Sequence, residues 1–174
     1  MDPLRDTLAW QFRMTWSLAR DHWLPALTDH MCLWSVTPSA ATIRQGEDGA
    51  WRPDWDEAPD PVPPATIGWL TWHIQWWWSE TICAVGDEAI LGRDAVVWPA
   101  TAEGIRTELT RLAETWAAVL TSLTTNDLER PVAYPWPEPR PLRMTVAWVN
   151  SELMKNTAEI GDVVRLYHAA EQTR

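Results

Sequence analysis

Residues 66–85 read TIGWLTWHIQWWWSETICAV. Apolar side chains recur there every three or four positions, which predicts a helix from about residue 64 to residue 85. Gly86 is a typical residue for ending such a helix. The buried stripe of this helix is expected to consist of Ile67, Leu70, Ile74, Trp77, Thr81 and Val85.

Three consecutive tryptophans, Trp76, Trp77 and Trp78, lie within this helix. Consecutive residues are about 100° apart on a helix, so the three side chains spread over roughly 200° and cannot share one face. We expect at least one of them to be exposed or to be buried in a subunit contact, and this apolar excess favours a homodimer.

Three further segments have helical periodicity, at about residues 3–27, 101–123 and 142–170. The first has a stripe of Leu4, Leu8, Phe12, Thr15, Leu18 and His22. The connections over residues 28–64 and 124–141 are rich in proline, which interrupts helices, and we expect no helix in the first of them. Leaving Trp34, Trp51 and Trp55 in water would be costly, so the first connection should fold back onto the helices. The sequence therefore predicts one all-α domain, residues 1–174, built as a four-helix bundle with long Trp- and Pro-rich connections.

Composition excludes several classes of partner. The formal net charge is −10, and the basic residues form no cluster, which argues against binding to nucleic acid or to an anionic membrane surface. No stretch approaches the roughly 20 apolar residues that a membrane-spanning helix needs, and the start of the chain lacks a signal-peptide pattern. The two cysteines, Cys32 and Cys83, fit small buried residues in a reducing compartment. We expect a cytoplasmic protein.

The 15 tryptophans allow two interpretations. Tryptophan can fill core positions in place of phenylalanine or leucine. It can also line a pocket or an interface, because it combines a large apolar surface with one N–H donor. Both interpretations remain open at the level of the sequence.

Polar residues fall on or beside two of the predicted buried stripes. His73 lies at the flank of the stripe of the second helix. On the last helix Glu152 and Asn156 are four residues apart and project from the same side, with Asn156 inside the apolar stripe and Glu152 at its margin. One interpretation is a set of ordinary polar contacts between helices, and the other is a divalent-metal site in the bundle core.

Three segments resemble the DinB/YfiT-like family, especially its actinobacterial branch, which is related to the N-terminal domains of mycothiol-dependent maleylpyruvate isomerases. They are TIGWLTWHIQWWW at 66–78, NDLERPVAYPWPEPRPLRMTVAW at 126–148 and WVNSELMKNTAEIGDVVRLY at 148–167. The resemblance implies a four-helix bundle with an up-down-down-up arrangement and a long crossover connection.

The resemblance also implies a divalent metal, zinc or nickel, held by a histidine of the second helix and by two residues of the last helix. His73 and Glu152 match the first two ligands, whereas Asn156 stands where the family has a histidine. Because a neutral amide oxygen is a poor ligand for these metals, we expect the metal to be weakly bound or absent. Glu159 or His22 could replace the missing ligand. A weak metal site, a metal-free pocket and a structural remnant remain three open interpretations.

The sequence thus supports three hypotheses for function. The first is a metal-dependent enzyme or enzyme relative of the transferase, isomerase or hydrolase type, with a low-molecular-weight thiol as co-substrate. Its small molecule would bind in a pocket between the second and last helices. The second is a non-catalytic domain that binds an apolar or aromatic small molecule in a Trp-lined pocket, without a metal. The third is a structural homodimer.

Overall fold

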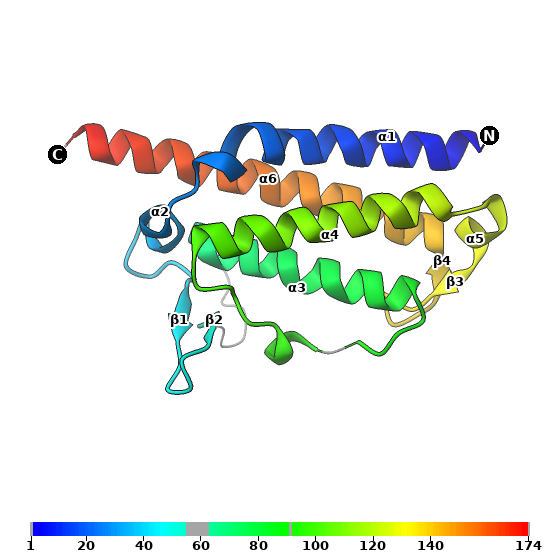
Figure 1. Ribbon diagram of the computed structural model, residues 1–174, viewed down its shortest axis with the longest axis horizontal. Helices are drawn as coiled ribbons and strands as arrows, with labels where there is room; N and C mark the ends of the chain where they lie inside the picture. Colours follow the sequence, from blue (N-terminus) through cyan, green and yellow to red (C-terminus); the bar gives the residue numbers. More distant parts are fainter. Residues whose placement is uncertain (1, 55–62, 91, 174) are drawn as a thin grey trace.

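Four long helices make up most of the protein. The computed structural model describes residues 2–54, 63–90 and 92–173. Figure 1 shows that α1 and α6 run in one direction and that α3 and α4 run in the other. The predicted all-α fold is confirmed, and the helices are α1 (Pro3–Leu18), α3 (Ile67–Val85), α4 (Ala102–Ser122) and α6 (Leu142–Gln172).

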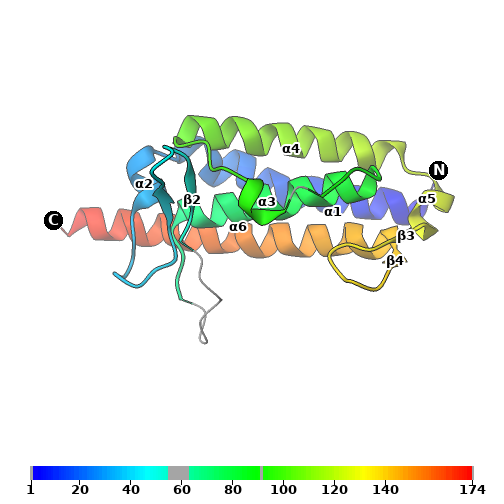
Figure 2. The same cartoon turned by 90° about the horizontal axis from the view of Figure 1, so that it is seen from below.

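The bundle has a closed arrangement in which each long helix touches two others. Helices α1 and α3 each pack against both α4 and α6. Figure 2 shows this packing along the length of the rods, with both termini at the ends of the bundle. The connection from α3 to α4 returns along the whole of α3, because α4 starts beside the end where α3 starts (Figure 1).

Short elements occupy the connections. The prediction that residues 28–64 hold no helix was wrong, because the side chain of Thr28 caps the backbone N–H of Met31 and starts the short helix α2. Strands β1 and β2 follow as an antiparallel hairpin, and a second strand pair, β3 with β4, lies within residues 131–141. The bounds are α2 Asp29–Leu33, β1 Ile43–Gln45, β2 Trp51–Pro53, α5 Thr125–Glu129, β3 Pro131–Val132 and β4 Arg140–Pro141.

The predicted stripe of the first helix was wrong at several positions. Leu8, Phe12 and Thr15 are buried, but Leu4, Leu18 and His22 are exposed. The helix changes to a π-helical turn over Ala19–Trp23 and then to a 3₁₀ turn over Leu24–Ala26. The wider turn shifts the inward face by one residue, so Ala19 and Trp23 take the buried positions.

Helix α3 is buried on nearly every side. All six residues of its predicted stripe are buried, and Trp69, Trp72 and Trp78 are buried as well. Trp77 and Trp78 are fully buried within the chain and Trp76 is partly buried, so none of the three is exposed; burial of Trp76 in a subunit contact stays a prediction. A helix that is apolar all round needs cover on all its faces, and here the connections supply what the other helices leave open.

The connections are tied to α3 by indole hydrogen bonds. Trp72 Nε1 donates to the carbonyl oxygen of Val96 at 2.9 Å, and Trp98 Nε1 donates to Thr71 Oγ1 at 3.0 Å. Trp51 packs edge-on against Trp98, with ring centroids 6.1 Å apart. In the same way Trp34 packs edge-on against Tyr167 of α6. The first connection therefore folds back onto the bundle, as predicted. Trp55 lies outside the described residues.

Both cysteines are free. Cys32 is fully buried, and burial, together with the charge of Asp29, raises the pKa of its thiol to about 12. Cys83 is partly buried. The prediction of a small buried residue holds for Cys32, whose thiol is kept protonated.

None of the helices formed by residues 2–54, 63–90 and 92–173 combines the length and the apolar character that a bilayer crossing demands.

Two glycines in helices provide a matched test of how closely the β1–β2 hairpin packs on α3. A Cβ atom at Gly68 would lie 2.7 Å from Ile43 Cδ1 and 2.9 Å from the carbonyl oxygen of Cys32, whereas the nearest atom at Gly161 is 3.9 Å away. We predict that Gly68→Ala lowers the free energy of unfolding by about 1–3 kcal/mol through overpacking. Gly161→Ala should raise it by about 0.5–1 kcal/mol through helix propensity. Urea unfolding followed by circular dichroism measures both, and a Gly68→Ala protein as stable as Gly161→Ala would contradict the tight seat of the hairpin on α3.

Candidate functional site

A buried hydrogen bond joins α3 to α6. Trp77 Nε1 donates to Asn156 Oδ1 at 3.2 Å, and both side chains are at most 2 % exposed. The amide nitrogen of Asn156 donates to Glu159 Oε2 at 3.0 Å. The predicted inward position of Asn156 is confirmed, and its amide already has a partner at each end.

His73 lies one turn before Trp77 and is held between aromatic rings. Its imidazole stacks on Trp69, with centroids 5.1 Å apart and planes at 14°, and it also contacts Trp76 at 5.7 Å. Its Nδ1 atom is buried without a hydrogen-bond partner. Burial, and secondarily the charge of Lys155, lower the pKa of His73 to about 4. The imidazole is therefore neutral at pH 7.

Glu152 is engaged on its own helix. Its carboxylate accepts a hydrogen bond from Lys155 Nζ at 2.5 Å, and its side chain is 22 % exposed. The positive charge that lowers the pKa of His73 thus comes from the partner of Glu152. The three residues expected to hold a metal all belong to α3 and α6, but Glu152 and Asn156 are each bound to other neighbours.

This donor set does not fit a zinc or nickel site. Such a site needs three donors free to point at one ion. Here Asn156 Oδ1 accepts from an indole, and Glu152 faces an ammonium group. Across the described ranges, no three His, Cys, Asp or Glu residues gather closely enough to hold a metal ion. Neither Glu159 nor His22 therefore replaces the missing ligand: Glu159 accepts from Asn156, and His22 is exposed on the π-helical turn.

Further along the same side of α3, four aromatic rings form a group that we call the Trp148 cluster: Trp77, Tyr134, Trp136 and Trp148. Trp148 on α6 is its centre. The ring centroids of Trp77, Tyr134 and Trp136 lie 5.5, 5.8 and 6.4 Å from that of Trp148, and all three meet it edge-on. Trp77 is buried, whereas the other three rings are partly exposed. Tyr134 and Trp136 belong to the Pro-rich segment between β3 and β4, which therefore covers the α3–α6 face.

Tyr134 links this cluster to a buried carboxylate. Its hydroxyl donates to the carbonyl oxygen of Trp77 at 3.3 Å, and its own carbonyl accepts from Thr145 Oγ1 at 2.8 Å. Burial, and then the nearby charge of Glu80, raise the pKa of Tyr134. Glu80 is only 7 % exposed and forms no ion pair with any residue whose position is described.

The sequence analysis did not identify Glu80, Tyr134, Trp136 or Trp148 as site residues. One signal was available for Glu80, because residues seven apart lie on the same face of a helix and Glu80 follows His73 by seven. No comparable signal existed for Tyr134 and Trp136, because the path of their proline-rich segment cannot be read from periodicity.

A cation already lies on the exposed edge of the cluster. The guanidinium carbon of Arg140 is 4.6 Å from the centroid of the Trp136 ring, within the range of a cation–π interaction. Arg140 forms no ion pair within the described part of the chain.

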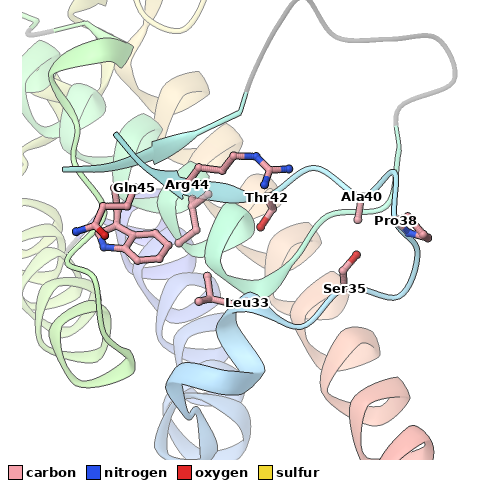
Figure 3. A pocket seen from close by; sticks show the side chains of 9 residues that line it. Leu33, Ser35, Pro38, Ala40, Thr42, Arg44 and Gln45 are labelled. Atoms are coloured by element: carbon pink, nitrogen blue, oxygen red, sulfur yellow. The ribbon is translucent and has the colours of Figure 1, made fainter. Parts of the chain in front are cut away.

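A cavity of about 550 Å³ lies elsewhere, beside the β1–β2 hairpin. Figure 3 shows that the segment from Leu33 to Ala40 forms one side of it and that Thr42, Arg44 and Gln45 of the hairpin region form the other. Trp51 is the single tryptophan among its lining residues, and His73, Glu152 and Asn156 do not line it. This cavity is thus distinct from the pocket predicted between the second and last helices, and a single tryptophan does not make it the predicted Trp-lined pocket.

Comparison with known proteins gave one match. A family model described as the DinB superfamily matches residues 11–160, which include α3, most of α6 and the segment that carries Tyr134 and Trp136. No curated protein and no solved structure matches the chain.

The low pKa of His73 leads to a prediction for stability. In metal-free protein the unfolded chain binds a proton at His73 near pH 6.5, whereas the folded chain does so only near pH 4. The stabilisation is complete above pH 6.5 and is lost as the pH falls towards 4, at up to about 1.4 kcal/mol per pH unit.

The measurement is the unfolding free energy of wild type and of His73→Gln between pH 7 and pH 4, with EDTA present. His73→Gln should lose less stability on acidification than wild type. His168→Gln, which changes an exposed histidine of α6, is the control and should behave like wild type. Parallel pH curves for wild type and His73→Gln would show that the imidazole is not held neutral.

Proposed function

Because the chain belongs to the DinB superfamily, we propose that it uses the α3–α6 face on which that family carries its ligands, but as a metal-free site that binds a small molecule. The protein in this proposal is a binding domain, with the Trp148 cluster and His73 as its recognition surface. The hydrogen bond between Trp77 and Asn156 carries the proposal, because it places an indole donor on the oxygen that a metal would need.

Two further features support a site without a metal. Lys155 places an ammonium group on Glu152, the carboxylate expected to bind the ion. A cation at this position opposes the entry of a second cation. The imidazole of His73 is flanked by Trp69 and Trp76, a setting suited to stacking against a flat or apolar ligand.

A second candidate, the metal-dependent enzyme with a thiol co-substrate, is favoured by one observation. His73 Nδ1 is buried, unpartnered and neutral at pH 7, which is the state that a metal-binding histidine requires. The same structure therefore offers one good donor, and metal titration separates the two candidates.

We predict that purified wild-type protein, stripped with EDTA, does not bind zinc or nickel at micromolar concentration. Isothermal titration calorimetry measures this directly. His73→Ala is the comparison, since binding that depends on a metal site would be lost in this variant. Micromolar binding by wild type that disappears in His73→Ala would refute the metal-free proposal and favour the enzyme.

The substitution Asn156→His shows which change removed the metal. If Asn156 alone does so, the variant gains zinc binding, and Asn156→His combined with His73→Ala loses it again. If Lys155 also opposes the ion, only Asn156→His combined with Lys155→Ala gains it. Zinc binding by wild type equal to that of Asn156→His would contradict the role given to Asn156.

Small-molecule binding has its own test with the neutral probe 3,3-dimethylbutan-1-ol. We expect saturation-transfer NMR at millimolar probe to show contact with wild type and to lose it in Trp148→Ala, which removes the centre of the cluster. Trp10→Ala is the matched control, because Trp10 is 57 % exposed on α1 and lies outside the cluster. Equal signals from the two variants would exclude the α3–α6 face as the binding surface.

A further inference from the structure

We propose that the Trp148 cluster and Glu80 together form a binding site for an organic cation, an ammonium or guanidinium compound. The inference rests on the proposed function, since it names the class of ligand for the same face. Three independent observations lead to it: a buried carboxylate without a cationic partner, a group of partly exposed indole and phenol rings, and an arginine that already occupies one of those rings.

The buried carboxylate is the first observation. Glu80 is 93 % buried, and no described arginine, lysine or histidine pairs with it. A buried charge is strongly disfavoured unless an opposite charge compensates it. Tyr134 shares a side-chain hydrogen bond with Glu80 but offers no positive charge; burial first, and then this carboxylate, raise the pKa of the phenol. An incoming cation would supply the missing partner.

The rings are the second observation. Trp136 and Tyr134 both meet Trp148 edge-on, at interplanar angles of 66° and 80°. Edge-on packing leaves ring faces available, and the face of an indole or phenol carries the negative part of the ring quadrupole. Faces of aromatic rings attract quaternary ammonium groups, and a carboxylate nearby adds to this attraction.

Arg140 is the third observation. Its guanidinium lies on the ring of Trp136 and pairs with none of the described carboxylates, although the chain has 24 acidic residues against 14 basic ones. The Trp136 ring is therefore able to attract a cation within the protein itself. In this proposal Arg140 competes with the ligand, because both approach the same electron-rich ring.

The chemistry of the face also argues against the other ligand classes. An anion would meet the uncompensated charge of Glu80 and an overall net charge of −10. A neutral molecule would gain contact with the rings but would leave Glu80 without an opposite charge. Only a cation uses both the rings and the carboxylate.

The experiment compares two probes of the same shape, choline and its uncharged isostere 3,3-dimethylbutan-1-ol. Dissociation constants for the full-length protein are measured by NMR titration of the indole N–H signals at low salt. We expect wild type to bind choline at least tenfold more tightly than the neutral isostere. Equal affinity for the two probes would overturn the proposal.

Substitutions then test each part of the site. Glu80→Gln keeps the shape and removes the charge, and it should reduce the preference for choline to less than threefold. Trp136→Leu, in the exposed segment, should weaken choline binding at least fivefold. Arg140→Ala should strengthen it about threefold, whereas Arg111→Ala, which removes an equal charge from α4, should leave it unchanged. Retention of full choline binding by both Glu80→Gln and Trp136→Leu would overturn the assignment.

The outcomes separate this inference from the proposed function. Binding of the neutral isostere that depends on Trp148, without any preference for choline, leaves the small-molecule site standing and overturns the cation site. Choline binding that depends on Glu80, in a protein that also binds zinc through His73, supports the cation site and overturns the metal-free proposal. Should neither probe bind, both proposals are overturned.

Discussion

The burial of α3 on all its faces is the constraint on which the rest of the structure depends. Tryptophans at positions 69, 72, 76, 77 and 78 point in every direction around this helix, and none of them is exposed. Two helices can cover only part of such a surface, so α4 and α6 pack on two sides and three connections close the remainder. The hairpin seats on Gly68, the α3–α4 connection is bound through Trp72 and Trp98, and the segment with Tyr134 lies over Trp77. The long proline-rich connections are therefore part of the core.

The same constraint explains why polar groups on α3 are so closely held. A helix without a solvent face must place its polar residues where a neighbour satisfies them. Trp77 does so through Asn156, and Thr71 does so through Trp98. His73 Nδ1 has no partner, but the side chain avoids the cost of a buried charge by remaining neutral between aromatic rings, as its lowered pKa shows. Glu80 shares a hydrogen bond with Tyr134, but none of the described residues gives it a cationic partner.

Much of the fold could be predicted from the sequence because three helices carry unbroken apolar periodicity; α3, α4 and α6 begin and end within three residues of the expected positions. Periodicity failed where the helix type changes, as in the π turn after Leu18, which moved the stripe from His22 to Trp23. It also failed for short elements defined by side-chain caps; Thr124 and Asp127 form a capping box that starts α5, a signal present in the sequence but overlooked.

For the site, the inward position of Asn156 followed from its place in the stripe. The pairing of Glu152 with Lys155 was not predicted, because Lys155 competes with the expected metal for this carboxylate. The approach of Tyr134 to Glu80 was not predicted either, because it depends on the path of a loop.

The two ends of the α3–α6 face differ in the charged groups that lie near them. His73 and Glu80 lie on one side of α3 about 10 Å apart, as seven residues of helix require. At the His73 end the ammonium of Lys155 acts on the imidazole and is paired with Glu152, whereas at the other end Glu80 has no cationic partner among the described residues. In the proposed site a cation is therefore attracted to the Glu80 end. The hydrogen bond between Trp77 and Asn156 lies at the first end, and the second end does not depend on it. The proposed absence of a metal and the proposed binding of a small molecule are thus compatible in one protein, because the two proposals depend on different residues.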